Sequence, residues 1–388
     1  MQLPVYLDNN ATTACDPRVV DAMLPYFTRY YGNAASRSHS FGWQAEEAVN
    51  NAREQIARLI GAGPEEIIFT SGATEADNLA IKGVSELYKT RGNHIITVAT
   101  EHKAVLDTCE HLEKQGSDLT YLPVQSNGII NLEQLEAAIK PSTILIAVMY
   151  ANNETGIIQP VREISALAKK HGIIFFSDAV QAAGKIPVDV NHDGIDLLAL
   201  TAHKIYGPKG VGALYKRRKN PRVKLAAQLH GGGHEKGMRS GTLNVPGIVG
   251  FGKAAELALA EMDKEALRLQ RLRDRLENAL LRLNNVEING STEHRMPHVC
   301  NLSFKYTESE GLMMGFNQNI AVSAGSACSS ATLEPSYVLK AMGLSDELAH
   351  ASLRFSLGRF TTEEEIDYAI GEIIETVTRL RKHQVLSI

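Results

Sequence analysis

The chain has 388 residues, which is too long for one ordinary hydrophobic core and predicts two domains. Its 44% hydrophobic and 22% charged residues are ordinary for a globular protein, and a net charge of −4 gives no drive toward nucleic acid or an anionic membrane. No apolar run approaches the roughly 20 residues that span a bilayer, and MQLPVYLDNNATT has no signal- or transit-peptide pattern, so we expect a cytoplasmic protein.

Strand and helix patterns alternate from about residue 45 onward. Apolar residues at helical spacing predict a helix over 43–62. Short apolar runs of strand length follow at 67–71, 95–99, 144–150, 173–177 and 197–201. This alternation is typical of a mostly parallel sheet with helices on both faces, in which ligands bind at the carboxyl ends of the strands. The segments that follow these runs are therefore candidates for a functional site.

The C-terminal third shows an α+β pattern. A long amphipathic helix is predicted over 253–284 and would connect two domains. Beyond it we expect strands near 298–304, 320–323 and 353–356, and helices near 335–342 and 362–381. The first dozen residues are expected to pack with this second domain or across the boundary between the two domains. We predict a large α/β domain over 13–255 and a smaller α+β domain formed by 1–12 and 256–388.

Asp178 and Lys204 follow two successive predicted strands. A carboxylate at the mouth of a central strand is poorly solvated and needs a cation or strong donors. One interpretation is a simple ion pair. The other is a site for pyridoxal phosphate, in which the lysine forms a Schiff base with the aldehyde and the aspartate keeps the pyridine nitrogen protonated, so that the ring acts as an electron sink.

The stretch SGATEADN, residues 71–78, fits the phosphate of such a cofactor. A strand runs into Gly72, and Ala73 and Thr74 then open a helix whose free N–H groups and dipole favour an anion. An ordinary capped helix with Glu75 in its first turn is the alternative.

Three more polar side chains follow predicted strands. His102 could stack on a flat ring, although a core or surface histidine is the commoner case. Asn153 and Gln181 could hydrogen-bond a ring hydroxyl. Each is unremarkable singly, and their co-location at strand ends is what favours a site.

The four cysteines lack the paired spacing of a disulfide framework or a zinc site, which indicates a reducing compartment. Cys328 lies in SAGSACSS, where Ser, Ala and Gly predict a mobile, solvated loop. An exposed thiol on such a loop can be a nucleophile, whereas a buried one is inert. Cys15, Cys109 and Cys300 are expected to be structural.

Long motifs run from YLDNNATT to SLGRFTTEEEID. They include SGATEADNLAIKG, TEHKAVLDTC, NNETG, DAVQAAGK, HKIYGPKG, HGGGHEKGMRSGT, GSACSSATLEPSYVLKAMG and LRFSLGRF. On these motifs the chain resembles the cysteine desulfurases of the bacterial NifS/IscS type, fold-type I pyridoxal-phosphate enzymes, and the IscS subgroup most. The resemblance implies an α/β large domain with a mostly parallel seven-stranded sheet, plus a smaller α+β domain.

The resemblance also implies roles for individual residues. Lys204 would carry the cofactor and move protons at the substrate Cα, Asp178 would pair with the ring nitrogen, and His102 would stack on the ring and share in acid–base steps. The other cofactor-binding residues would be Ala73, Thr74, Asn153, Gln181, Thr201, His203 and Thr242. Among them Gln181 would bond the phenolic oxygen, and Thr242 would reach the phosphate of a neighbouring subunit, which implies a homodimer.

The implied reaction converts L-cysteine to L-alanine. Arg354 and Asn153 would bind the substrate carboxylate, a task for which a guanidinium is suited. Cys328 would attack the substrate sulfur and become a persulfide. The sulfur would serve iron–sulfur cluster assembly on a scaffold protein, with tRNA thiolation as a further destination. No metal site is expected, apart from a transient contact of Cys328 with an iron–sulfur cluster.

Two segments depart from the family pattern. Residues 32–36 read GNAAS, where the family often has proline after the asparagine, which would loosen a turn. The sequence ends at RLRKHQVLSI, where IscS proteins usually continue with an aromatic, acidic tail that docks the scaffold, so docking in the usual manner is not expected.

Alternative functions stay open on the sequence alone. A selenocysteine lyase would use the same scaffold, because sulfur and selenium make similar demands on the site, whereas Cys328 argues against an aminotransferase. A dehydrogenase-like binding module would need G-x-G-x-x-G after the first strand, and SGATEA lacks that spacing.

Overall fold

The computed structural model describes residues 1–324 and 334–385. In this described part a seven-stranded sheet has the order β2-β8-β7-β6-β5-β3-β4, and β8 alone runs antiparallel to its neighbours. The strands are β2 (Ile67–Thr70), β3 (His94–Val98), β4 (Asp118–Leu122), β5 (Thr143–Ala147), β6 (Ile174–Asp178), β7 (Leu197–Thr201) and β8 (Gly212–Lys216). The mostly parallel α/β sheet predicted from the sequence is confirmed, and the carboxyl ends of all strands except β8 lie along one edge.

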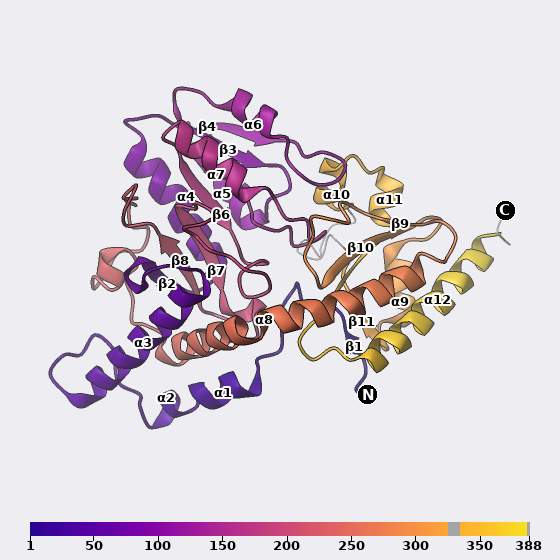
Figure 1. The fold of residues 1–388 in the computed structure, drawn as a ribbon, viewed down its shortest axis with the longest axis horizontal. Coiled ribbons are helices and arrows are strands. Elements are labelled where there is room, and N and C mark those ends of the chain that lie inside the picture. Colours follow the sequence, from indigo (N-terminus) through magenta and orange to yellow (C-terminus); the bar gives the residue numbers. More distant parts are fainter. Residues whose placement is uncertain (325–333, 386–388) are drawn as a thin grey trace.

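Helices cover both faces of this sheet (Figure 1). The core on one face is built with α4 (Ala73–Tyr88) and α5 (Lys103–Lys114), whose apolar residues are buried against β3, β5, β6 and β7. The core on the other face includes α3 (Ser40–Leu59), α7 (Val161–Lys170) and the first half of α8 (Val245–Leu280). Shorter helices are α1 (Pro17–Met23), α2 (Pro25–Thr28) and α6 (Leu132–Ala138). Because both faces are covered, the inner strands are buried on both sides and largely apolar rather than alternating.

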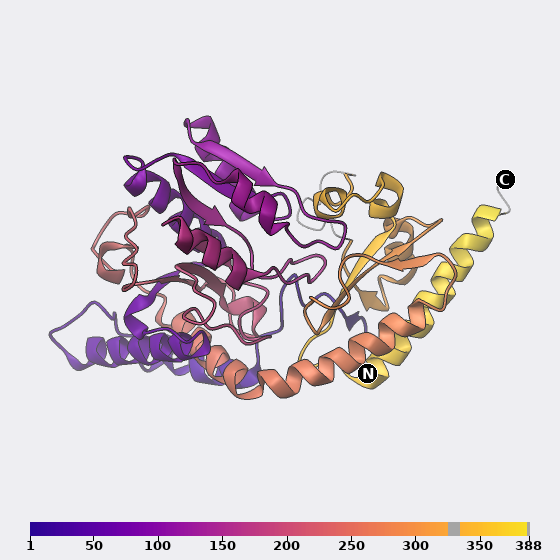
Figure 2. The same cartoon turned by 45° about the horizontal axis from the view of Figure 1, so that its top comes forward.

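The long helix α8 runs from the large sheet to the C-terminal part of the chain, as Figure 2 shows. The sequence pattern predicts its start at residue 253, and that prediction is wrong. The helix begins at Val245, where the Asn244 side chain accepts the Gly247 N–H at 3.1 Å. Its first turns are rich in glycine because α8 lies close against α1 and α3: a methyl group on Gly252 would come within 2.6 Å of Ala52.

A second core lies at the far half of α8. Here β12 (Ser352–Ser356), β10 (Val299–Phe304) and β9 (Val286–Ile288) form an antiparallel sheet. The helices of this part are α9 (Ser309–Phe316), α10 (Tyr337–Ala341), α11 (Asp346–His350) and α12 (Glu363–Val385). The N-terminal β1 (Val5–Tyr6) pairs in parallel with β11 (Ile320–Ala321), so the first residues do pack with this second part, as predicted. The domain limits at 12/13 and 255/256 stay a prediction.

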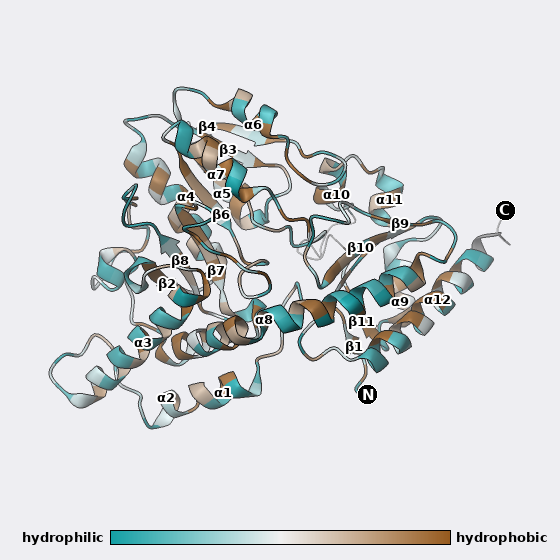
Figure 3. Ribbon diagram, viewed as in Figure 1, coloured by the Kyte–Doolittle hydropathy of each residue, from teal (hydrophilic) through white to brown (hydrophobic). Residues whose placement is uncertain are grey.

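Two strands of the large sheet have no counterpart in the sequence-based prediction. β4 is an edge strand with a polar, half-exposed face, and β8 starts at Gly212, shortly after the glycine- and proline-containing segment 205–210. Apolar and polar residues alternate along α8 and α12 (Figure 3). None of the helices in the described part combines the length and apolar character that crossing a bilayer requires.

Candidate active site

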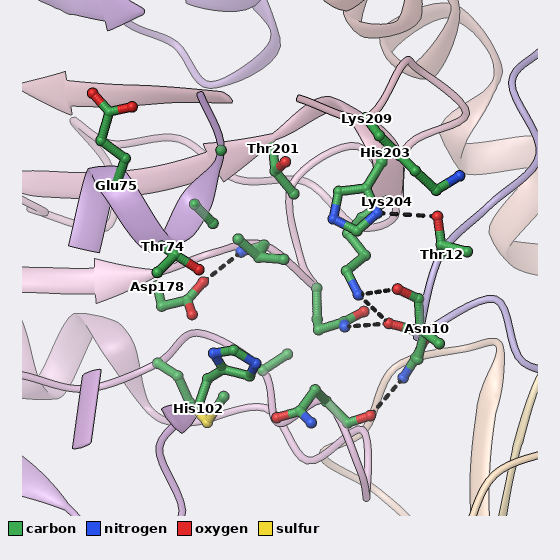
Figure 4. A pocket seen from close by; sticks show the side chains of 18 of the residues that line it. Asn10, Thr12, Thr74, Glu75, His102, Asp178, Thr201, His203, Lys204 and Lys209 are labelled. Atoms are coloured by element: carbon green, nitrogen blue, oxygen red, sulfur yellow. Dashed lines mark hydrogen bonds between the residues drawn. The ribbon is translucent and has the colours of Figure 1, made fainter. Parts of the chain in front are cut away.

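A pocket of ≈ 610 Å³ opens at the carboxyl edge of the large sheet. Figure 4 shows that its side chains come from separate strand ends and project toward a common space. The residues predicted from the sequence that line it are Ala73, Thr74, His102, Asn153, Asp178, Gln181, Thr201, His203, Lys204 and Arg354. The segments that follow β2, β3, β5, β6 and β7 are thus brought together, because all five strands point the same way.

Lys204 projects into this pocket from a turn of 3₁₀ helix, Ala202–Lys204, directly after β7. Its Nζ donates to the carbonyl oxygens of Asn10 and, at 2.6 Å, of Ala11 (Figure 4). These contacts hold a primary amine at the pocket wall, in position to react with an aldehyde.

Asp178 ends β6 and is buried at the base of the pocket. Burial raises the pKa of Asp178, whereas His102, the Val180 N–H at 2.9 Å and Lys204 oppose that rise. Two more buried acids, Asp77 and Glu101, interact with it, and burial raises the pKa of each of them well above its usual range. A cationic ring nitrogen against Asp178 would relieve the cost of burying its charge.

His102 lines the pocket directly before α5. Its Nδ1 accepts the Ala104 N–H at 3.1 Å, so the side chain acts as the N-cap of that helix. In the neutral ring the proton therefore lies on Nε2. The cap fixes the orientation of the imidazole, which a ring that stacks on a flat ligand needs.

The start of α4 has the properties of an anion site. Its N-cap is Gly72, which supplies no side chain, and a Cβ built there would meet nothing within 4 Å. Glu75 does not cap its own helix end: its carboxylate accepts the Ser71 N–H and pairs with Arg239 at 2.7 Å. The N–H groups of this turn therefore face open space in the pocket, which fits a phosphate group. The missing side-chain cap favours an anion site over an ordinary capped helix, although Glu75 does lie in the first turn.

His203 lies across the pocket from this turn and contacts Thr12 Oγ1 at 3.1 Å (Figure 4). Burial lowers the pKa of His203 to about 4, and the charges of Lys204 and Lys209 act in the same direction. The imidazole is therefore neutral at pH 7, and the nearby lysines leave a positive field that suits a phosphate dianion.

Arg354 reaches the pocket from β12, on the small sheet. One guanidinium nitrogen donates to Asp8 Oδ1 at 2.6 Å and another to the Asn153 carbonyl at 2.9 Å. Its Nε and the Asn153 side-chain oxygen are buried, with no hydrogen-bond partner among the described residues. The unpaired Nε–H can donate to a ligand carboxylate, whereas the Asn153 oxygen can only accept from an N–H or O–H group of a ligand.

Two predicted residues are not placed in the pocket. Thr242 is exposed and lies outside its lining. Cys328 lies outside the described residues. The flanks of its segment are described: Ser323 pairs with Arg354, which lines the pocket, and Ser336 donates to the carboxylate of Glu154, the residue after Asn153. The other cysteines are free thiols, buried at Cys109 and Cys300 and partly buried at Cys15.

The sequence-based reasoning missed Asn10, Thr12 and Lys209, which also line the pocket. Asn10 and Thr12 belong to YLDNNATT, and Lys209 to HKIYGPKG. Both motifs carry the family resemblance, which was the available signal. The strand-end argument covers the segment of Lys209, which follows β7, but not residues 8–12, which arrive from the other sheet.

Glu154 gives a pH-dependent prediction. Its carboxyl is only 3% exposed, and burial raises the pKa of Glu154 from 4.5 to about 7, against the opposing effects of Ser336, Arg354 and His102. Between pH 4.5 and about 7 the folded chain therefore holds a proton that the unfolded chain releases, so this group's contribution to stability is lost as the pH rises.

Glu154→Gln should remove that loss. The free energy of unfolding of each protein would be measured in urea at pH 5 and at pH 8. The difference between variant and parent should shift by about 3 kcal/mol in favour of the variant over this range. If the free energies of unfolding of the two proteins changed with pH in the same way, the pKa of Glu154 would not be raised in the folded protein.

Comparisons with known proteins agree with this geometry. The aminotransferase class V family model matches residues 5–369. The chain is 58% identical over 383 residues to the cysteine desulfurase IscS of Anaeromyxobacter dehalogenans, covering 98% of this chain and 94% of that protein. It is 58% identical over 384 residues to the cysteine desulfurase IscS of Photorhabdus laumondii, covering 98% and 95%. A solved NifS-like protein superposes with a TM-score of 0.90 at 38% identity, over 97% of this chain and all of that one.

Proposed function

The chain belongs to the class V aminotransferase family and, within it, to the cysteine desulfurases, and from that premise we propose that its pocket binds pyridoxal phosphate and takes the sulfur from L-cysteine. The observation that carries the proposal is the joint presence of the Lys204 amine and the buried Asp178 carboxylate in one pocket, beside an uncapped helix start. A simple ion pair would need neither that open helix end nor the unpaired atoms near Arg354.

The residues present fit the cofactor. The first turn of α4, with Thr74, and the neighbouring Thr201 and His203 would hold the phosphate, Asp178 would face the ring nitrogen, and Gln181 the phenolic oxygen. Pyridoxal phosphate would supply the electron sink that makes the Cβ–S bond of cysteine breakable. Lys204 would attach the cofactor and carry the proton to and from Cα, and His102 would lie against the ring.

Arg354, steadied by Asp8 and Asn153, would bind the substrate carboxylate and so aim the thiol end of cysteine into the pocket. The Cys328 thiolate would then form a bond to the substrate sulfur as the Cβ–S bond breaks, and protonation of Cβ gives alanine. The sulfur stays on the protein as a persulfide for iron–sulfur cluster assembly, with a scaffold protein as acceptor. Free thiols at the three described cysteines suit a reducing cytoplasm.

The test is a parallel assay of alanine and sulfide. The protein with pyridoxal phosphate should absorb visible light and, with a reducing thiol present, form alanine and sulfide from L-cysteine in equal amounts. Protein that stays colourless with added cofactor would overturn the proposal. Alanine formation from selenocysteine but not from cysteine would replace it with a selenocysteine lyase.

We also propose a homodimer in which Thr242 reaches the phosphate of the partner's site. Large apolar side chains are exposed around α2 and the start of α3, including Phe27 at 59%, Tyr31 at 66% and Trp43 at 55%. A monomer rarely leaves so many aromatic side chains in water within one segment, and a second copy would cover them.

Mixing two inactive variants tests the shared site. Thr242→Asp would repel the partner's phosphate, and Lys204→Ala disables its own pocket. Co-refolded in equal amounts, they should recover about a quarter of the parental activity, because half of the dimers would be mixed and would contain one intact site. Activity no higher than the mean of the two separate variants would mean that Thr242 serves its own chain or none.

A further inference from the structure

A chain of hydrogen bonds runs behind the pocket wall through Asn10. The Asn10 carbonyl accepts from Lys204 and, at 3.0 Å, from the Gln181 side-chain amide. The other end of that amide, Gln181 Oε1, accepts from the Lys185 amine at 3.2 Å. Lys185 in turn lies 3.2 Å from Nε2 of His298, which contacts Asn10 Oδ1 at 2.9 Å. These hydrogen bonds therefore form a closed ring that begins and ends at Asn10.

The orientation of the Asn10 side-chain amide fixes the directions of the hydrogen bonds made by His298. The Asn10 amide donates its Nδ2 to the Asn153 carbonyl at 3.0 Å, so its Oδ1 is the atom that faces His298. An oxygen acceptor requires a proton on His298 Nε2, and the buried Nδ1, which has no partner among the described residues, is then the bare nitrogen of a neutral ring. Burial lowers the pKa of His298 well below its usual range, in agreement.

The protonation state of Lys185 must be compatible with a proton on His298 Nε2. A protonated Nε2 cannot accept from an ammonium, whereas a neutral amine can share the Nε2–H with Asn10 Oδ1 through its lone pair while it donates an N–H to Gln181. Burial and the charge of Lys204 lower the pKa of Lys185 to about 7, which favours the neutral amine. Lys185 and His298 border a separate small cavity and do not line the pocket, so neither is placed to touch a ligand there.

We infer that Lys185, oriented by His298, is a positioning residue that holds the Gln181 amide with its NH₂ group toward the cofactor pocket. A side-chain amide can rotate and exchange its two ends, and only the NH₂ end can donate to an anionic ring oxygen. Lys185 at Oε1 and the Asn10 carbonyl at Nε2 secure the two ends. This inference rests on the proposed function, since the ring oxygen belongs to pyridoxal phosphate.

The test compares Lys185→Met, Gln181→Met and the double variant. Lys185→Met should weaken cofactor binding roughly threefold to tenfold, and shift the pH midpoint of the visible band in the direction seen for Gln181→Met, as expected for one lost hydrogen bond. The double variant should be no worse than Gln181→Met alone, because both changes remove the same contact. Equilibrium dialysis and a spectrophotometric pH titration provide these readouts without turnover.

Lys169→Met is the matched control, since Lys169 is exposed on α7 and should change neither quantity. His298→Gln, which keeps a donor for Asn10, should resemble the parent more than His298→Leu does. Additive effects of the two methionine variants, or an unshifted band in a well-folded Lys185→Met, would overturn the inference while leaving the proposed function intact. A parent protein without any visible band would instead overturn the proposed function.

Discussion

Lys204→Ala is expected to abolish covalent attachment of pyridoxal phosphate and to lower the rate of alanine formation by roughly 10³-fold or more. Lys204 is held at the pocket wall by the carbonyl oxygens of Asn10 and Ala11, and alanine provides neither its amine nor its proton-transfer group. The measurement is peptide mapping after borohydride reduction. The mass of the cofactor should appear on the peptide that contains Lys204 in the parent, and on no peptide in the variant.

Lys209→Ala is the matched control, because it removes a second lysine side chain from the lining of the same pocket and leaves Lys204 in place. That variant should keep the cofactor on the Lys204 peptide even if its phosphate is held less tightly. Equal unfolding midpoints of the apo forms would show that the fold survives both changes. Label on Lys209 in the parent, or parental alanine output from Lys204→Ala, would contradict the assignment.

The strand-end argument explains which site residues could be found without the structure. His102, Asp178 and Lys204 each follow a short apolar run, and parallel strands deliver such residues to one edge whatever the rest of the chain does. The phosphate turn at Gly72 follows from the same local rule, strand then helix. These features depend on sequence neighbours, so local patterns suffice to predict them.

Other parts of the site depend on long-range pairing that no local pattern contains. Asn10 reaches the pocket because β1 pairs with β11 and Asp8 bridges to Ser356, which brings the N-terminal segment across from the small sheet. Arg354 lies on β12 in that sheet, and only the family resemblance pointed to it. The contact between Lys185 and His298 joins residues 113 positions apart. The role inferred for this contact depends on how the side-chain amides of Asn10 and Gln181 are oriented, which only folding of the chain determines.

The three described thiols, Cys15, Cys109 and Cys300, ionise less readily than a free thiol. Burial raises the pKa of Cys109 to about 12, so about one thiol in 10⁴ is a thiolate at pH 8. Burial raises the pKa of Cys300 as well, and burial with the charge of Asp16 raises that of Cys15. None of the three lines the pocket. This supports our proposal that sulfur transfer falls to Cys328, whose segment is flanked by residues in contact with Arg354 and Glu154.

Cys328→Ala is accordingly expected to retain the cofactor and to change its visible spectrum when L-cysteine is added, but to release sulfide at less than roughly one hundredth of the parental rate. Without a thiolate to accept the sulfur, the Cβ–S bond has no attacking partner. With ³⁵S-cysteine, label that a reducing thiol can remove should appear on the parent and be absent from the variant. Cys15→Ala, which removes a partly buried thiol away from the pocket, should keep parental label and sulfide output. Label that persists in Cys328→Ala and disappears in Cys15→Ala would assign the persulfide to Cys15 and refute the role of Cys328.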